Sequence, residues 1–175
     1  MSAKPRASAP PTLTGNTIRD SALGRVPETL GEIVALNTAV WQRSLVSPTL
    51  LEVIRLRNAR TVNCVYCKAV RYEVARADGL SEARAAMIDE NYAASALSER
   101  EKLAVALADA YLGFPAGVTA QLAARLAREF SPEQIASLFV ALMTFNFTSR
   151  TAVSIGGMPE DPLPVMLLPV SATSA

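Results

Sequence analysis

Apolar residues recur at helical spacing along most of the chain. They form stripes along one face of segments from about residue 28 to 44 and from 48 to about 61, and along two later segments. The members of these four stripes are Leu30, Ile33, Val34, Val40 and Trp41; Leu51, Ile54 and Asn58; Leu103, Leu107 and Tyr111; and Val118, Leu122 and Leu126. No segment of useful length alternates apolar and polar residues with a period of two, so the pattern predicts an all-α protein.

Capping residues and glycines divide the chain into about seven or eight helices. A serine precedes the expected starts at Ser47-Pro48, Ser98–Glu101 and Ser131–Gln134, and the last two also carry the Glu or Gln of a capping box. Glycines fall where helices should stop, at Gly79, Gly113 and the Gly156-Gly157 pair. We therefore expect a compact helical bundle.

The two ends differ in composition from this helical part. Residues 1–24 are rich in Pro, Ala, Ser and Thr without a long apolar core, which predicts a mobile N-terminal arm and no secretory signal. Residues 25–157 form the expected helical domain. Residues 158–175 contain four prolines and the apolar run Val165–Leu168, which predicts an extended tail. Such a tail should pack on its own domain or across a partner subunit.

The segment 132–154 is apolar almost all round, which indicates a central helix or a subunit interface. Its longest apolar stretch, Ile135 to Phe147, is too short to span a bilayer and is followed by Arg150. We therefore expect no membrane association and a cytoplasmic location, where a single disulfide is more often catalytic than structural.

Charge and composition exclude several classes of function and of site. The 175 residues carry 17 Lys and Arg against 16 Asp and Glu, which removes the usual electrostatic argument for nucleic-acid binding. The chain has no histidine, so imidazole-based triads, metal sites and proton shuttles are excluded. We expect neither a metal nor an organic cofactor.

The one motif that can carry chemistry is Cys64-Val65-Tyr66-Cys67. If Asn63 caps a helix, the two cysteines lie about one turn apart on a shared face, from which they can form a disulfide. A helix N-terminus and nearby cations stabilise the reactive thiolate. The cations here are Lys68 and Arg71, and Arg71 is expected on the same helix face as Cys67.

Three other interpretations of this motif are a zinc site, a purely structural disulfide and a pair of unreactive thiols. A zinc ion needs about four ligands, and two sulfurs could supply them only at a site shared between subunits. A purely structural disulfide would close a very small loop and stabilise little. Two inert buried thiols are the main competing interpretation. A CxxC motif alone is a moderate indication of redox activity, and it becomes a strong one only when neighbouring residues support that chemistry.

Glu52 is a candidate partner of this motif, twelve residues before Cys64. It lies two to three turns from the bend expected near residues 61–63, so it reaches Cys67 only if the next helix folds back closely. A carboxylate buried beside a thiol could accept its proton. In isolation, a helical glutamate is more commonly a solvated surface residue.

These residues resemble the alkylhydroperoxidase D-like/carboxymuconolactone decarboxylase family. The peroxidase branch of that family has Glu, eleven residues, Cys, two residues, Cys, three residues and His, and the spacing of Glu52, Cys64 and Cys67 fits this pattern. The runs that carry the resemblance are Leu51-Glu52, Asn63–Arg71, Leu97–Ala104 and Phe130–Glu133. The resemblance covers roughly residues 28–157 and implies an all-helical fold and a homo-oligomer.

The resemblance also implies roles for these residues. Cys67 would be the peroxidatic cysteine, Cys64 the resolving cysteine and Glu52 the base. Arg71 stands where the family has histidine, and arginine cannot shuttle a proton, although it can stabilise anions. Tyr66 or Tyr72 could donate a proton instead. The external electron donor implied by the resemblance is a lipoyl-type or thioredoxin-type dithiol.

The sequence thus predicts a thiol-dependent peroxidase or disulfide reductase that acts on hydroperoxides through its CxxC pair. Two alternatives stay open. One is a non-catalytic, redox-responsive oligomeric binding protein, which the Arg71 substitution favours. The other is a carboxymuconolactone decarboxylase-like enzyme, whose chemistry would not require the two cysteines.

Overall fold

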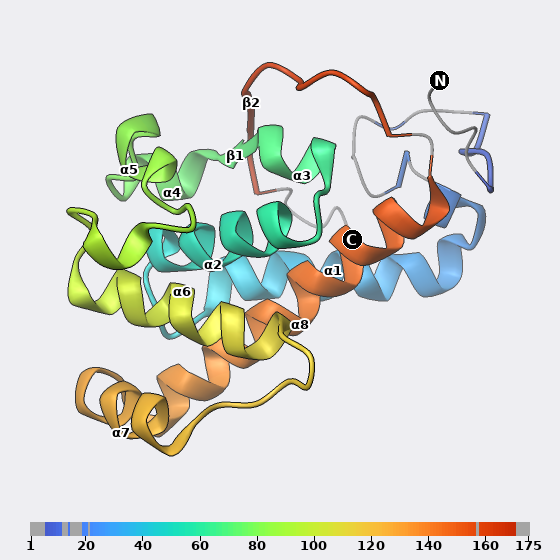
Figure 1. The fold of residues 1–175 in the computed structure, drawn as a ribbon. Helices are drawn as coiled ribbons and strands as arrows, with labels where there is room; N and C mark the ends of the chain where they lie inside the picture. The colour runs from blue at the N-terminus through green and yellow to red at the C-terminus, as the bar shows by residue number, and fades with distance from the viewer. Residues whose placement is uncertain (1–5, 12–13, 15–18, 21, 157, 171–175) are drawn as a thin grey trace.

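The computed structural model describes residues 6–11, 14, 19–20, 22–156 and 158–170. Within these residues the chain forms eight α-helices, two short 3-10 helices and two strands of three residues (Figure 1). In chain order these are η1 (Ala22–Arg25), α1 (Pro27–Arg43), α2 (Pro48–Thr61), α3 (Val65–Ala69), β1 (Val70–Tyr72), α4 (Glu73–Ala77), α5 (Glu82–Ala86), η2 (Tyr92–Ala94), α6 (Glu99–Leu112), α7 (Ala120–Glu129), α8 (Pro132–Ile155) and β2 (Met166–Leu168). The predicted all-α class is confirmed.

Helix α2 lies at the centre of the core. It is buried continuously from Thr49 to Ala59, and it packs against α6, α8, α4 and α3 (Figure 1). Its start is set as predicted, because the Ser47 side chain accepts a hydrogen bond from the Leu50 N–H. Every face of α2 therefore meets another element, and each of its polar residues must find a partner inside the protein.

The predicted starts of α6 and α8 are also confirmed. Ser98 with Glu101 and Ser131 with Gln134 each form a complete capping box. Helix α8 ends at Gly156, whose φ of 82° lies in the left-handed region that glycine adopts without strain.

The segment around the cysteines differs from the predicted helix. Cys64, not Asn63, is the N-cap of α3, and Asn63 takes a left-handed φ of 55°. Helix α3 ends after five residues, and Arg71 lies in β1, so it does not share a helix face with Cys67. The physical reason is a distant partner, because β1 pairs in parallel with β2 of the C-terminal tail, with Arg71 opposite Leu167.

This pairing places the C-terminal tail on its own domain, the first of the two arrangements considered (Figure 1). At the other end, the backbone N–H of Arg6 donates to the Ile155 carbonyl at 2.7 Å, and Arg25 Nε donates to the Ser8 carbonyl at 2.6 Å. The rest of the expected arm (1–5, 12–13, 15–18 and 21), Gly157 and residues 171–175 lie outside the described residues. The mobility of the arm and the domain boundaries stay predictions.

Helix α8 has a buried and an exposed face. Six residues are buried, among them Leu138, Leu142 and Phe145, whereas Val140, Met143 and Phe147 are exposed. The helix has 24 residues because its cap and Gly156 lie beyond the stretch Ile135–Phe147, and by length and composition alone the whole helix could cross a membrane. One such helix is weak evidence for a membrane location, since the core helix of a soluble protein meets the same criteria.

Candidate active site

Cys64 and Cys67 form a disulfide at the start of α3, with their Cα atoms 5.2 Å apart. The two sulfurs differ in environment. Cys64 is fully buried, and its Sγ accepts the backbone N–H of Cys67 at 3.2 Å, whereas Cys67 is only partly buried. A reagent from outside can therefore approach Cys67 more directly than Cys64.

A cavity of about 410 Å³ opens beside Cys67. Its lining is mostly apolar and comes from η1, α1, α2, α3, β1, α8 and the two terminal segments. The apolar side chains include Val70, Phe145, Ile155, Met158 and Leu168. The polar lining includes Asn37, Arg55, Tyr72 and Ser149. A cavity with a mostly apolar wall and a few convergent polar groups is typical of a small-molecule site.

Arg55 links the predicted base to the cysteine segment. Its Nε and Nη2 donate to the Glu52 carboxylate at 2.7 and 2.6 Å, and its Nη1 and Nη2 donate to the carbonyls of Cys67 and Val70 at 2.7 and 2.6 Å. Glu52 is fully buried. Burial alone would lower the pKa of Arg55, but the charge and hydrogen bonds of Glu52 outweigh it and raise that pKa. Arg55 is therefore a permanent cation at this site, and it binds the backbone of α3 at Cys67 and of the residue that follows the helix, Val70.

Tyr72 forms the next part of the polar wall. Its ring stacks on Trp41 with centroids 4.2 Å apart, and the Arg55 guanidinium carbon lies 5.7 Å from its centroid. Burial raises the pKa of Tyr72, although the positive charge of Arg55 and a hydrogen bond with Asn37 act in the opposite direction. The phenol therefore keeps its proton at neutral pH and can act as a donor toward the cavity.

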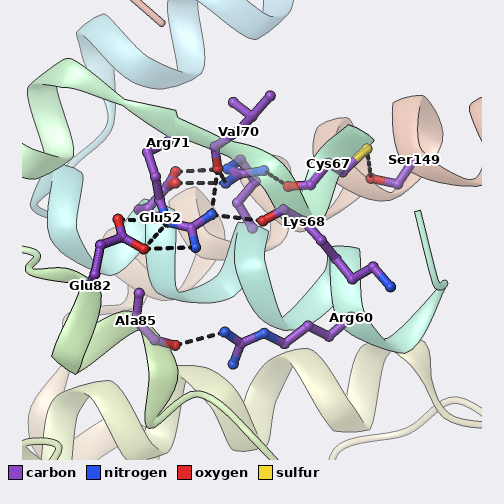
Figure 2. Close-up of polar contacts among 10 residues, drawn as sticks. Glu52, Arg60, Cys67, Lys68, Val70, Arg71, Glu82, Ala85 and Ser149 are labelled. Atoms are coloured by element: carbon purple, nitrogen blue, oxygen red, sulfur yellow. Dashed lines mark hydrogen bonds and ion pairs between the residues drawn. The ribbon is translucent and has the colours of Figure 1, made fainter. Parts of the chain in front are cut away.

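Ser149 is a site residue that the sequence analysis missed. Its hydroxyl donates to Cys67 Sγ at 3.3 Å, as Figure 2 shows, and it accepts a hydrogen bond from Asn58 Nδ2 at 3.0 Å. No local pattern indicates it, because it lies 82 residues after Cys67 on an apolar helix. An asparagine in the apolar stripe of α2 was the available signal, since a buried amide requires polar partners.

Arg71 takes a different position from the other predicted site residues. Its guanidinium forms an ion pair with Glu82 at 3.1 Å and donates through Nη1 to the carbonyls of Lys68 and Val70, both at 2.8 Å. Figure 2 shows it directed toward Glu82, while the Cys67 sulfur is directed toward Ser149. The structure thus brings Cys64 and Cys67 together, connects Glu52 to them through Arg55, and directs Arg71 to Glu82. The catalytic roles of all four residues stay predictions.

Among the described residues there is no group of three or more His, Cys, Asp or Glu side chains that could hold a metal ion. The functional groups gathered at the site are the two sulfurs, the Arg55 guanidinium, the Glu52 carboxylate, the Tyr72 phenol and the Ser149 hydroxyl.

Comparisons with known proteins place the fold. No family model matches the chain. Two uncharacterized proteins of Mycobacterium tuberculosis, from strains CDC 1551 and H37Rv, are each 31% identical to it over 118 residues. The match covers 67% of this chain and spans only 41% of the length of those relatives.

A solved structure is similar over more of its own length. It is a protein of unknown function from Agrobacterium tumefaciens, which its name proposes as an antioxidant defence protein AhpD. The two folds superpose with a TM-score of 0.64 at 25% identity, covering 74% of this chain and 88% of the other. The fold is therefore an all-α, AhpD-like fold. Together with a CxxC disulfide beside a cavity, it is compatible with a redox function.

Proposed function

We propose that the protein is a thiol-dependent peroxidase or disulfide reductase that uses Cys67 and Cys64 as its redox pair. The observation that carries this proposal is the asymmetry of the disulfide. Cys67 lines a mostly apolar cavity, and the fully buried Cys64 is already within bonding distance of it. This is the arrangement needed for one sulfur to meet a substrate and the other to resolve the product.

In the oxidative half of the cycle, the Cys67 thiolate attacks the terminal oxygen of a hydroperoxide. The O–O bond breaks, Cys67 becomes a sulfenic acid, and the other oxygen leaves as an alkoxide or hydroxide that takes up a proton. The Cys64 thiolate then attacks the Cys67 sulfur and forms the disulfide, and the hydroxyl leaves as water after it gains a proton. Two electrons pass from the cysteine pair to the peroxide.

In the reductive half, an external dithiol returns these two electrons. Its thiolate attacks Cys67 Sγ, because Cys64 is fully buried, and Cys64 leaves as a thiolate. The second thiol of the donor then attacks the mixed disulfide, which releases Cys67 and oxidises the donor. We expect a lipoyl-type or thioredoxin-type dithiol in this role.

The charged residues support this chemistry in distinct ways. Glu52 is the proposed base, and its fixed contact with Arg55 means that it acts from within that ion pair. Arg55 lies against the Cys67 carbonyl, where its positive charge favours a nearby thiolate. Arg71 would contribute only from its position beside Glu82. We further propose that the protein is a cytoplasmic homo-oligomer.

A second candidate is a redox-responsive binding protein. It is supported by the strand β2, which pairs with the segment directly after the cysteines, so that a change at the disulfide adjoins the tail. The chain also has no histidine with which to complete the proton relay of the peroxidase branch. In this case the disulfide would alter a binding surface without turnover.

Peroxide consumption driven by dihydrolipoamide tests the proposal. The wild type is compared with Cys67→Ser and Cys64→Ser, with cumene hydroperoxide and hydrogen peroxide as oxidants. We expect turnover in the wild type, none in Cys67→Ser, and a single oxidation event without cycling in Cys64→Ser. Thioredoxin with its reductase serves as a second donor. A wild type that does not exceed the buffer rate with either donor contradicts the peroxidase proposal and favours the binding protein.

A further inference from the structure

The environment of Ser149 is unusual for a serine on an apolar helix. The residue is 3% exposed, and its hydroxyl has two partners in the described part of the chain, Cys67 Sγ at 3.3 Å and Asn58 Nδ2 at 3.0 Å. Helix α8 thus supplies a polar group directly at the sulfur that lines the cavity. A sulfur in a disulfide is a weak acceptor, whereas a thiolate is a strong one, so this contact gains strength when the pair is reduced.

The contacts of Asn58 fix the direction in which Ser149 donates. Asn58 Nδ2 lies 3.2 Å from the Phe145 carbonyl, which can only accept, so the side of the amide facing α8 must be the NH2 group. The same NH2 group gives its other hydrogen to Ser149 Oγ. Because Ser149 accepts from Asn58, its own hydrogen is free to point at Cys67.

Asn58 also lowers the stability of the fold, because it buries a polar atom without a partner among the described residues. It is fully buried, and its Oδ1 has no hydrogen-bond partner among the described residues. A leucine at this position of α2 would match the apolar neighbours and leave no polar atom unpaired. The amide therefore has a use that outweighs the unpaired oxygen, and its one side-chain partner is Ser149 in the same part of the chain.

We infer that Ser149 is a catalytic residue, whose hydroxyl stabilises the thiolate form of Cys67, and that Asn58 is the positioning residue that orients this hydroxyl. The inference rests on the proposed function, because it assigns the group that supports the attacking thiolate in a chain without histidine. The hydrogen bond joins residues 82 positions apart in the sequence, Ser149 on α8 and Cys67 in the middle of α3.

The thiolate can be measured without peroxide. A Cys64→Ser protein has a single thiol, Cys67, and keeps a side-chain acceptor at the N-cap of α3. The rate of alkylation by iodoacetamide is recorded against pH in this background, alone and with Ser149→Ala, Ser149→Thr or Thr148→Ala. Thr148 lines the same cavity, but its hydroxyl donates to carbonyls of its own helix, so it is the matched control.

We expect Ser149→Ala to raise the alkylation midpoint by about one pH unit, as loss of a hydrogen bond to a charged group implies. Ser149→Thr retains the hydroxyl and should restore the midpoint, and Thr148→Ala should leave it unchanged. Equal midpoints for Ser149→Ala and its parent overturn the inference. So does an equal shift in Thr148→Ala, since that would reflect only a change in the cavity.

Asn58→Leu tests the positioning role. It should raise the midpoint by less than Ser149→Ala does, and it should add nothing in a Ser149→Ala background, because Asn58 acts through Ser149. An equal additional shift in that background contradicts the positioning role. If Asn58→Leu does not fold, as judged by circular dichroism, Asn58→Ala is measured in both backgrounds with the same expectations. A shifted midpoint in a protein without peroxide turnover would overturn the proposed function and leave the role of Ser149 in place.

Discussion

Two arginines that are two residues apart on α2, Arg55 and Arg57, both form ion pairs with carboxylates, but the two ion pairs differ in burial and in role. Arg55 and Arg57 are each 6% exposed, and each donates to carboxylates. The partner of Arg55 is Glu52, whose side chain is 0% exposed. Arg57 binds Asp109 and Glu90, whose side chains are 33% and 86% exposed.

This difference in burial corresponds to a difference in role: Arg55 belongs to the candidate active site, whereas Arg57 stabilises the packing of α2. Arg55 lies in the interior and binds the backbone of the cysteine segment, so its charge acts where the sulfur chemistry takes place. Arg57 points to the other side of α2, where it ties this helix to α6 and to the segment before η2. Solvent can replace part of what Arg57 provides, whereas it cannot reach Glu52.

The largest effect should come from removing Arg55. In Arg55→Met the Glu52 carboxylate is left buried without its counter-charge, which should lower the free energy of unfolding by about 3–5 kcal/mol. The double variant Glu52→Gln/Arg55→Met removes both charges and should recover part of this loss. Urea unfolding followed by circular dichroism measures both. A double variant no more stable than Arg55→Met would show that the buried charge is not the cause.

Arg57→Met should have a smaller effect, a loss of about 2 kcal/mol from its hydrogen bonds to charged groups. It also removes the contact between the guanidinium and the Tyr92 ring, whose centroid lies 5.6 Å away. The same urea titration measures it. If Arg57→Met costs as much as Arg55→Met, solvent access to the carboxylates does not distinguish the two clusters.

Arg71→His should cost about 1 kcal/mol, because the variant loses the Glu82 contact and two hydrogen bonds to carbonyls at the end of α3. Peroxide turnover should not rise, since position 71 lies in β1 and its side chain faces Glu82. Thermal unfolding and the dihydrolipoamide assay are measured on one preparation. A rise in turnover would mean that a histidine at this position completes a proton relay.

The smallest effect is expected at Glu90. Its side chain is mostly in water, so Glu90→Gln should change the free energy of unfolding by less than about 0.5 kcal/mol. Because 0.5 M NaCl screens this exposed ion pair, the difference in free energy of unfolding between the wild type and Glu90→Gln should become smaller still at that salt concentration. A loss above 1 kcal/mol would place Glu90 among the residues that hold α2 and α6 together.

Helix boundaries could be predicted because they depend on nearby residues. The capping boxes at Ser98 and Ser131 and the stop at Gly156 are local hydrogen-bonding and backbone preferences, and the structure has them where the sequence indicated. The end of α3 could not be predicted in this way. It depends on the pairing of β1 with Met166–Leu168, about a hundred residues later.

The candidate active site, too, has one part that local sequence predicts and another that only the tertiary structure determines. The spacing of Cys64 and Cys67 is enough to predict that they can form a disulfide, since three residues of helix or turn hold them close. Their surroundings are a matter of tertiary packing. Which side chain binds Glu52, where Arg71 points, and that Ser149 reaches Cys67 all depend on how α2, α8 and β1 lie against one another. Local sequence determines an element and its ends, whereas a buried polar group takes whichever partner the fold brings within hydrogen-bond distance.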